Sequence, residues 1–146
     1  MNQAVGTIDP GFNSTGNSHS GVPTLSVNGP WLDNNHGHRR NTPYKTFGKT
    51  TEFTGAANAS AIWVYLDEDS YSLNDGGFGF GMNTPEWIDW PGTYHNLACG
   101  FAFADGHSEI HKWKNASTVV VGGNVARRGV TPNPDWQWMK DHTSSR

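Results

Sequence analysis

The sequence predicts an α+β domain built mainly of antiparallel β-sheet, with long loops and a short C-terminal helix. Asp105-Gly106 lies between two alternating apolar and polar runs, and Asp-Gly in that setting is the strongest short-range sign of a β-hairpin. The 18 Gly and 8 Pro, together with scattered Asn, Ser and Thr, are typical of short strands joined by long turns. Asn133-Pro134 predicts the start of a helix, with Asn133 as the N-cap and Pro134 in the first turn.

The hairpin is expected to close through a two-residue type I′ turn at Asp105-Gly106, because Asp tolerates positive φ and Gly adopts it without steric cost. Such a turn places Phe101 opposite Ile110 and Cys99 opposite Lys112. Alternation then predicts one core face, made of Leu97, Cys99, Phe101, Phe103 and Ile110. The other face carries small residues at every second position: Ala98, Gly100, Ala102 and Ala104. Either the long side chains of the second strand fold over this small face, or a helix or another chain covers it.

Four further elements are predicted along the chain. Residues 61–67 form a strand that is apolar on both faces, so we expect it to be covered on both sides and to pair with residues 97–104. Residues 84–91 form a short helical turn that ends at a proline, and residues 115–131 form a loop. The C-terminal helix docks through Trp136 and Met139, which lie three positions apart.

Length and composition limit the organisation and the partners of the chain. Its 146 residues suit one domain, which we divide into a loop-rich arm or upstream remnant, residues 1–43, and a globular domain, residues 44–146. The 10 basic and 13 acidic residues give a net charge of −3 without a basic run, which argues against nucleic acid as a partner. The single cysteine, Cys99, forms no internal disulfide, and its place in an apolar strand predicts a packing role.

A spaced motif surrounds this hairpin: His95, then nine residues, then Asp105-Gly106. The chain thereby resembles the bacterial H-X9-DG domain of prepilin-type, processing-associated proteins, which are related to type II secretion pseudopilins. Four segments carry the resemblance in the order of the family: WVYLDEDSYSLNDGGF, WIDWPGTYHN, FADGHSEIHKW and DWQWMKDHT. The resemblance covers roughly the second two-thirds of the chain and is thin before Tyr44.

The resemblance implies a non-enzymatic structural subunit of a pseudopilus or type IV pilin-like extracellular filament. Such a subunit acts at the bacterial cell surface by self-association or by contact with other pilin-like subunits, and it is membrane-bound on the outer side of the cytoplasmic membrane before assembly. The signature residues are then expected to be architectural: His95, Asp105, Gly106 and His107.

The start of the chain departs from the pattern of the family. Relatives begin with a cleavable leader and a long apolar helix, whereas this chain opens MNQAVGTIDP, without an apolar run of 18 residues or a signal-peptide pattern. We therefore expect a fragment of a longer precursor, a trimmed chain or a misassigned start. Contact with a membrane would occur only through the missing N-terminal helix.

An acidic segment offers a candidate calcium site. Five residues supply the hard oxygen ligands that Ca²⁺ prefers: Asp67, Glu68, Asp69, Asn74 and Asp75. The spacing is not that of an EF-hand, and the simpler alternative is a turn whose acids face water. Related pseudopilins carry calcium in a C-terminal loop, so the resemblance favours the calcium hypothesis.

Two other classes of function are open to the sequence. An enzyme could use the hairpin histidines, but His107 and His111 would lie about 13 Å apart on one strand, and no catalytic motif is present. A surface carbohydrate-binding module could use some of the seven Trp as stacking platforms, although a chain poor in aliphatic residues needs Trp for its core. A glycan could also be attached, because three segments match the N-x-[ST] pattern, beginning at Asn13, Asn58 and Asn115.

Overall fold

The structure, a computed structural model, describes residue 47 and residues 50–53, 58–73, 78–82, 85–120 and 128–144. The arm predicted over residues 1–43 lies outside this part. The described strands are β1 (Trp63–Leu66), β2 (Phe80–Gly81), β3 (Glu86–Trp87), β4 (Ala98–Phe103), β5 (Ser108–Lys112) and β6 (Arg128–Gly129). The helices are the 3₁₀ turns η1 (Thr50–Glu52), η2 (Ala59–Ala61) and η3 (Ala116–Thr118), and the α-helix α1 (Pro134–Thr143).

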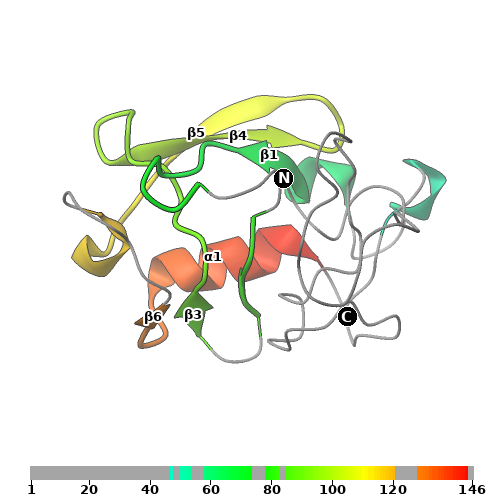
Figure 1. The fold of residues 1–146 in the computed structure, drawn as a ribbon. Helices are drawn as coiled ribbons and strands as arrows, with labels where there is room; N and C mark the ends of the chain where they lie inside the picture. Colours follow the sequence, from blue (N-terminus) through cyan, green and yellow to red (C-terminus); the bar gives the residue numbers. More distant parts are fainter. Residues whose placement is uncertain are drawn as a thin grey trace, which may run out of the picture.

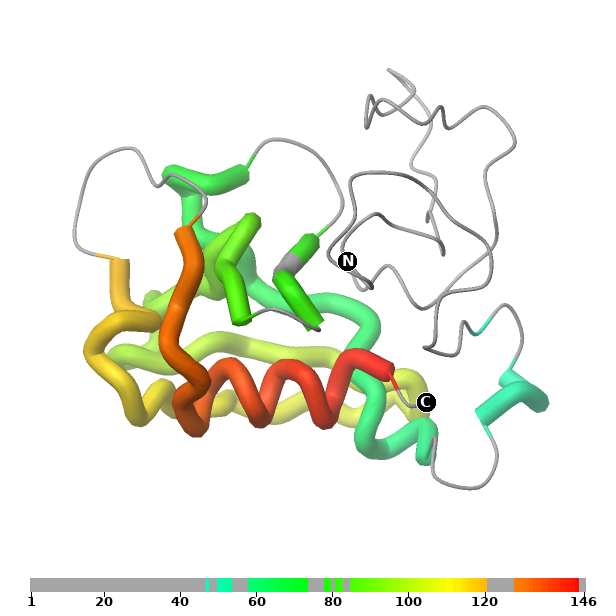
Figure 2. The backbone as a smooth tube through the Cα atoms, turned by 90° about the horizontal axis from the view of Figure 1, so that it is seen from below, coloured from blue at the N-terminus to red at the C-terminus, as the bar shows by residue number. Residues whose placement is uncertain are grey.

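These elements form two antiparallel sheets and one packed helix, which confirms the predicted α+β class. The main sheet has the order β1-β4-β5, and α1 lies along one face of its β4–β5 hairpin (Figures 1 and 2). The smaller sheet has the order β2-β3-β6, and each of its strands is two residues long. Aromatic residues dominate the buried core, whose largest fully buried side chains include Trp63, Trp87, Trp90 and Phe47.

The β4–β5 hairpin forms at Asp105-Gly106, but its register differs by one residue from the predicted one. Ala102 pairs with Ser108 and Phe101 with Glu109, so three residues, 104–106, form the loop. The N–H of Gly106 donates to the carbonyl of Phe103, and among the loop residues Gly106 alone has positive φ, at +94°. This geometry is a turn followed by a left-handed glycine, so the predicted type I′ turn is wrong.

A shift of one residue turns every side chain of β5 to the opposite face. Cys99 faces His111 instead of Lys112, and Ile110 is 64 % exposed instead of buried. Leu97, the other misassigned core residue, is 47 % exposed because it precedes β4 in a left-handed conformation. Cys99, Phe101 and Phe103 are buried as expected.

The small-residue face of β4 is the face that α1 does not cover. Trp138 of α1 contacts Phe101 and stacks on His111, both on the opposite side of the sheet. Helix α1 therefore does not supply the helical cover that was one of the expected alternatives for this face. Cover by another chain remains a prediction.

Strand β1 pairs with β4 as predicted, but it is not covered on both faces. A bulge between Trp63 and Tyr65 inserts one residue, so that Trp63 lies opposite Phe103 and Leu66 opposite Phe101. The bulge breaks the simple alternation. Trp63 is consequently buried in the core, whereas Tyr65 is 52 % exposed on the outer face.

Gly106→Val should lower the free energy of unfolding by about 1–3 kcal/mol, because a β-branched residue at φ +94° is strained even where space is open. Thermal and urea melts measure the change. Gly129→Ala is the matched control, since a Cβ there meets nothing within 4 Å and the glycine has no positive φ. Equal stability of Gly106→Val and the native chain would contradict the turn geometry.

The C-terminal helix begins as predicted and is fixed at its start by a buried carboxylate. The Asn133 side chain accepts hydrogen bonds from the N–H groups of Asp135 and Trp136, which makes it the N-cap. Asp135 is fully buried and accepts from the backbone N–H groups of Lys114 and Asn115 at 2.9 Å each. The Thr118 hydroxyl donates to the same carboxylate at 2.7 Å. One side chain thus joins the start of α1 to the segment after β5.

Three buried indole N–H groups connect distant parts of the fold. Trp63 donates to the Thr143 hydroxyl at the end of α1, and Trp136 donates to the carbonyl of Gly81 in β2. Trp113 donates to the carbonyl of Gly92 in the loop before β4. Trp136 and Met139 are both buried, which confirms the predicted docking side of α1. The helix therefore holds both sheets.

Residues 84–91 do not form the predicted helical turn. Within this segment Glu86 and Trp87 form β3, which pairs with β2 on one side and with β6 on the other. The predicted loop over residues 115–131 likewise contains η3 and β6. Strands of two residues are too short to show an alternating pattern, so the smaller sheet could not be predicted from periodicity.

Candidate functional site

Asp67, directly after β1, makes hydrogen bonds to several of the residues that form the candidate site. Its Oδ2 accepts the N–H of Gly100 at 3.0 Å and lies 3.1 Å from Nε2 of His95. Its backbone carbonyl accepts the N–H of Gly92 at 2.6 Å and the thiol of Cys99 at 3.3 Å. A Cβ on Gly100 would lie 2.8 Å from Oδ2 of Asp67, so only glycine leaves room for this carboxylate.

His95 is held by a strained turn that leads into β4. The N–H of Leu97 donates to the carbonyl of Thr93, and the N–H of His95 donates to the carbonyl of Ala98. Asn96 and Leu97 have φ of 56° and 63°. Leucine rarely adopts this left-handed conformation, so the surrounding hydrogen bonds must hold the turn in place. The side chains of His95 and Asp67 remain 48 % and 45 % exposed.

The spacing of the sequence motif has a structural explanation. His95 is fixed at one end of β4 and Asp105-Gly106 forms the turn at the other end, so the nine intervening residues are the turn entering β4, the strand itself and Ala104. The signature residues therefore lie at opposite ends of one strand and do not come together.

The side chain of Asp105 bonds to both the backbone and the imidazole of His107 across the hairpin turn. Oδ1 of Asp105 accepts the backbone N–H of His107 at 3.1 Å and lies 2.6 Å from its Nδ1. The hydrogen bond from the backbone N–H, followed by that from the imidazole, lowers the pKa of Asp105 below its ordinary value of 3.8. The imidazole of His107 also stacks on Phe103 at 4.3 Å between ring centroids. These contacts fix the turn and suit an architectural role.

The described acids of the candidate calcium segment bond to the protein itself. Asp67 binds Gly100, Glu68 accepts the Ser72 hydroxyl, and Asp69, which is buried, accepts the N–H of Tyr71. The remaining two candidates, Asn74 and Asp75, lie outside the described residues. Within the described part, no group of three or more His, Cys, Asp or Glu is placed to hold a metal ion.

The calcium hypothesis predicts that the melting midpoint is higher in millimolar Ca²⁺ than in EDTA. An ion at 100 times its dissociation constant would stabilise the fold by about 2.7 kcal/mol. Asp75→Asn should abolish the difference, because it removes one charged ligand. Equal midpoints in Ca²⁺ and EDTA for the native chain would contradict calcium binding and would leave an ordinary acidic turn.

The faces of the six described tryptophans are covered by the protein. Five are at most 5 % exposed: Trp63, Trp87, Trp90, Trp113 and Trp136. Trp138 is half-buried and stacks on two imidazoles, that of His111 at 3.8 Å and that of His142 at 4.2 Å. Among these six residues there is thus no open ring for a sugar to stack on, and Trp31 lies outside the described part.

The contact between β5 and α1 contains His111, an imidazole that stacks on Trp138 and whose pKa is shifted. Burial lowers the pKa of His111 below 6.5; the nearby acids Asp135 and Glu109 oppose this shift, and Lys114 and His142 add to it. Since the fold favours neutral His111, its contribution to stability is complete above pH 6.5 and decreases as the pH falls through that value toward the lower pKa of the folded state.

We therefore expect the native chain to lose more stability between pH 7.5 and pH 5 than the His111→Phe variant does. Phe keeps an aromatic ring against Trp138 but cannot titrate. Urea denaturation of both proteins at each pH measures the difference. Identical losses would show that His111 does not carry the pH dependence.

The buried cysteine plays the predicted packing role. Cys99 has no exposed surface, and burial raises the pKa of its thiol to about 12. A reactive cysteine requires a lowered pKa and access to solvent, and Cys99 has neither.

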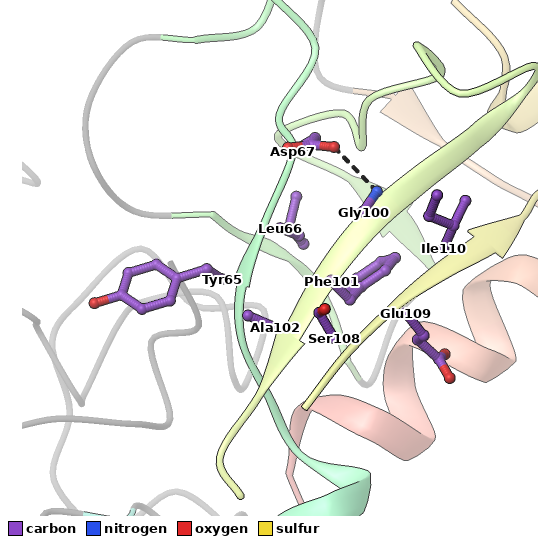
Figure 3. A pocket seen from close by; sticks show the side chains of 9 residues that line it. All are labelled: Tyr65, Leu66, Asp67, Gly100, Phe101, Ala102, Ser108, Glu109 and Ile110. Atoms are coloured by element: carbon purple, nitrogen blue, oxygen red, sulfur yellow. Dashed lines mark hydrogen bonds between the residues drawn. The ribbon is translucent and has the colours of Figure 1, made fainter. Parts of the chain in front are cut away.

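The outer face of the main sheet forms a shallow hollow, shown in Figure 3. Its floor is Gly100 and Ala102 of β4, and its sides are Tyr65 of β1 and Ile110 of β5. Asp67 borders one end, where its hydrogen bond to Gly100 is drawn. The hollow arises because β4 has small residues between two strands that carry large exposed side chains.

Sequence reasoning located the signature residues but missed their partners. Asp67 was expected among calcium ligands, and its pairing with His95 could not be inferred across 28 positions. The sequence indicated a role for Asp135 only through its position as an acid in the first turn of a helix. That position does not reveal the groups to which Asp135 bonds. Asn58 and Asn115, two of the three glycan acceptors, use their side chains to cap η2 and η3.

Comparisons of the chain with models of protein families, with curated proteins and with solved structures found no match. No helix in the described part is both long and apolar enough to cross a membrane.

Proposed function

We propose that this chain is a non-enzymatic, pseudopilin-like subunit domain that acts by self-association in an extracellular filament at the bacterial cell surface. The observation that carries the proposal is the arrangement of the motif His95, nine residues, Asp105-Gly106 around β4. The motif belongs to the resemblance with prepilin-type proteins. Its residues bond to Asp67 at one end of the strand and form the hairpin turn at the other end.

The hydrogen-bond partners of the histidines also support a structural function. In the described part His95 and His107 each pair with a carboxylate, and His142 pairs with the carbonyl of Trp138. Catalysis by an activated nucleophile needs a histidine beside a hydroxyl or thiol. Here the imidazoles fix turns and cover aromatic rings, which suits a rigid subunit domain.

The alternative of a carbohydrate-binding module with Trp platforms lacks support in this part of the chain. The six described Trp are either buried or, for Trp138, half-buried and stacked on two imidazoles. A glycan array with the purified chain tests sugar binding directly, and specific binding would argue for a module of a different class.

The proposal is tested by immunogold electron microscopy of bacteria that express the gene from its own locus. Antibodies raised against residues 44–146 are expected to label extracellular filaments, and the labelled material should be released by shearing. A strain from which the gene is deleted is the control. Label that is confined to the cytoplasm, or a sheared fraction that lacks the protein, would overturn the proposal.

A further inference from the structure

The outer edge of β5 is open in the described part of the chain. Strand β5 is the last strand of the order β1-β4-β5, and its register with β4 is regular over five pairs. The N–H of Phe103 donates to the carbonyl of His107, and the N–H of Trp113 donates to the carbonyl of Leu97, so both residues that flank β5 face β4. By the alternation of an antiparallel ladder, Glu109 and His111 also face β4.

The remaining three residues of β5 direct their backbone groups away from the sheet. These are Ser108, Ile110 and Lys112, whose N–H and carbonyl groups point away from β4 by the same alternation. An edge of this kind is a template for another strand unless proline, a bulge or unfavourable charges block it. Residues 108–112 contain no proline, and their pairing with β4 contains no bulge.

The side chains along β5 are complementary to those of a second, antiparallel copy of the same strand, so we consider that copy as the partner of this edge. If two β5 strands pair antiparallel about a two-fold axis at Ile110, all five residues of each strand find a partner. Glu109 then lies opposite His111 of the second copy, and Lys112 lies opposite its Ser108. A carboxylate beside an imidazole is favourable, and no two like charges face each other.

The neighbouring registers are worse for the same side chains. An axis at Glu109 would bring two carboxylates directly opposite each other, and an axis at His111 would bring two imidazoles together. Both also shorten the overlap of the two strands. The sequence of β5 is therefore self-complementary in one register, with the exposed Ile110 side chains adjacent at its centre.

We infer that two copies of this chain join through their β5 edges, antiparallel about Ile110, to form one continuous six-stranded sheet. Figure 3 shows the side chains of Glu109 and Ile110 leaving β5 in different directions, so the Glu109–His111 pairs and the isoleucine contact lie on different sides of the joined sheet. The inference does not rest on the proposed function, because a closed two-fold pair requires neither a filament nor a further helix.

The association is measured by sedimentation of the purified chain over a concentration series. The native chain should show a monomer–dimer equilibrium, and Ile110→Lys should weaken it at least about tenfold, because two ammonium groups meet at the axis. Leu73→Lys is the matched control, since Leu73 is also 64 % exposed but lies outside the strand. A native chain that stays monomeric throughout, or an Ile110→Lys variant that dimerises as the native chain does, would overturn the inference.

Cysteine cross-linking tests the register independently. Residues at the axis of a hydrogen-bonded pair have Cα atoms about 5.5 Å apart, within the range of a disulfide. Ile110→Cys should therefore form a covalent dimer under mild oxidation, whereas Glu109→Cys should not, because its Cα atoms lie diagonally, about 7–8 Å apart. The native Cys99 is buried and does not interfere. Efficient cross-linking of Glu109→Cys with none of Ile110→Cys would overturn the register.

Discussion

Asp135→Ala should lower the free energy of unfolding by about 3 kcal/mol or more, the largest loss we expect from a polar substitution in this chain. The carboxylate has no exposed surface and accepts from two backbone N–H groups and from the hydroxyl of Thr118. Each buried donor that loses its acceptor costs about 1–3 kcal/mol. The negative charge also lies in the first turn of α1, where the helix dipole favours it. Urea denaturation at neutral pH measures the change.

Asp135→Asn separates the loss of charge from the loss of the acceptor. Asn has nearly the same shape but only one acceptor oxygen, so its effect should be intermediate. Asp141→Ala is a surface control, because Asp141 is an exposed acid on the same helix. If Asp135→Ala were no more destabilising than Asp141→Ala, Asp135 would not join α1 to the segment after β5.

Trp63→Ala should destabilise the chain by about 3–5 kcal/mol, the range found when large buried aromatic residues are truncated. Trp63 has no exposed surface and packs edge-to-face against Phe78 and Phe101 at 5.9 and 6.2 Å between ring centroids. Its indole N–H donates to the Thr143 hydroxyl at 3.0 Å, so the truncation also disconnects β1 from the end of α1.

Tyr65→Ala is the matched control for Trp63→Ala. Both aromatic residues lie on β1, but the bulge turns Tyr65 to the outer face, where it is 52 % exposed. Its truncation should cost less than about 1 kcal/mol, as is usual for surface substitutions. Similar losses for the two variants in thermal and urea melts would contradict the assignment of the bulge.

The hairpin illustrates how far the sequence could predict the fold. Asp105-Gly106 located the turn correctly, because few other residues adopt its backbone angles. The same dipeptide fits both a two-residue loop and a three-residue loop that ends in a left-handed glycine. The choice depends on whether Asp105 has positive or negative φ, which the local sequence does not determine. That difference placed His111 against the core and Ile110 in solvent.

Strand β1 and the candidate site were likewise predicted only in part from the sequence. Alternation over residues 61–67 predicted a strand correctly but could not reveal a bulge, because both of its faces are apolar in the sequence. The motif predicted architectural roles for His95 and Asp105, and in the structure these residues lie at the two ends of β4. The partner of His95 is Asp67, which lies 28 positions earlier and also accepts the N–H of Gly100, and only the folded chain brings these residues together.

The thiol of Cys99 is a natural chemical probe for opening of the fold around the central strand β4. It is the only thiol in the chain, lies in β4 and donates to the carbonyl of Asp67 at the end of β1. A thiol with a pKa of about 12 and no exposed surface reacts only after the protein opens around it. The rate of alkylation in native buffer, compared with the rate in denaturant, therefore gives the population in which the fold has opened around Cys99. No residue needs to be replaced for this measurement, so it applies equally to the chain in isolation and in any assembly that it joins.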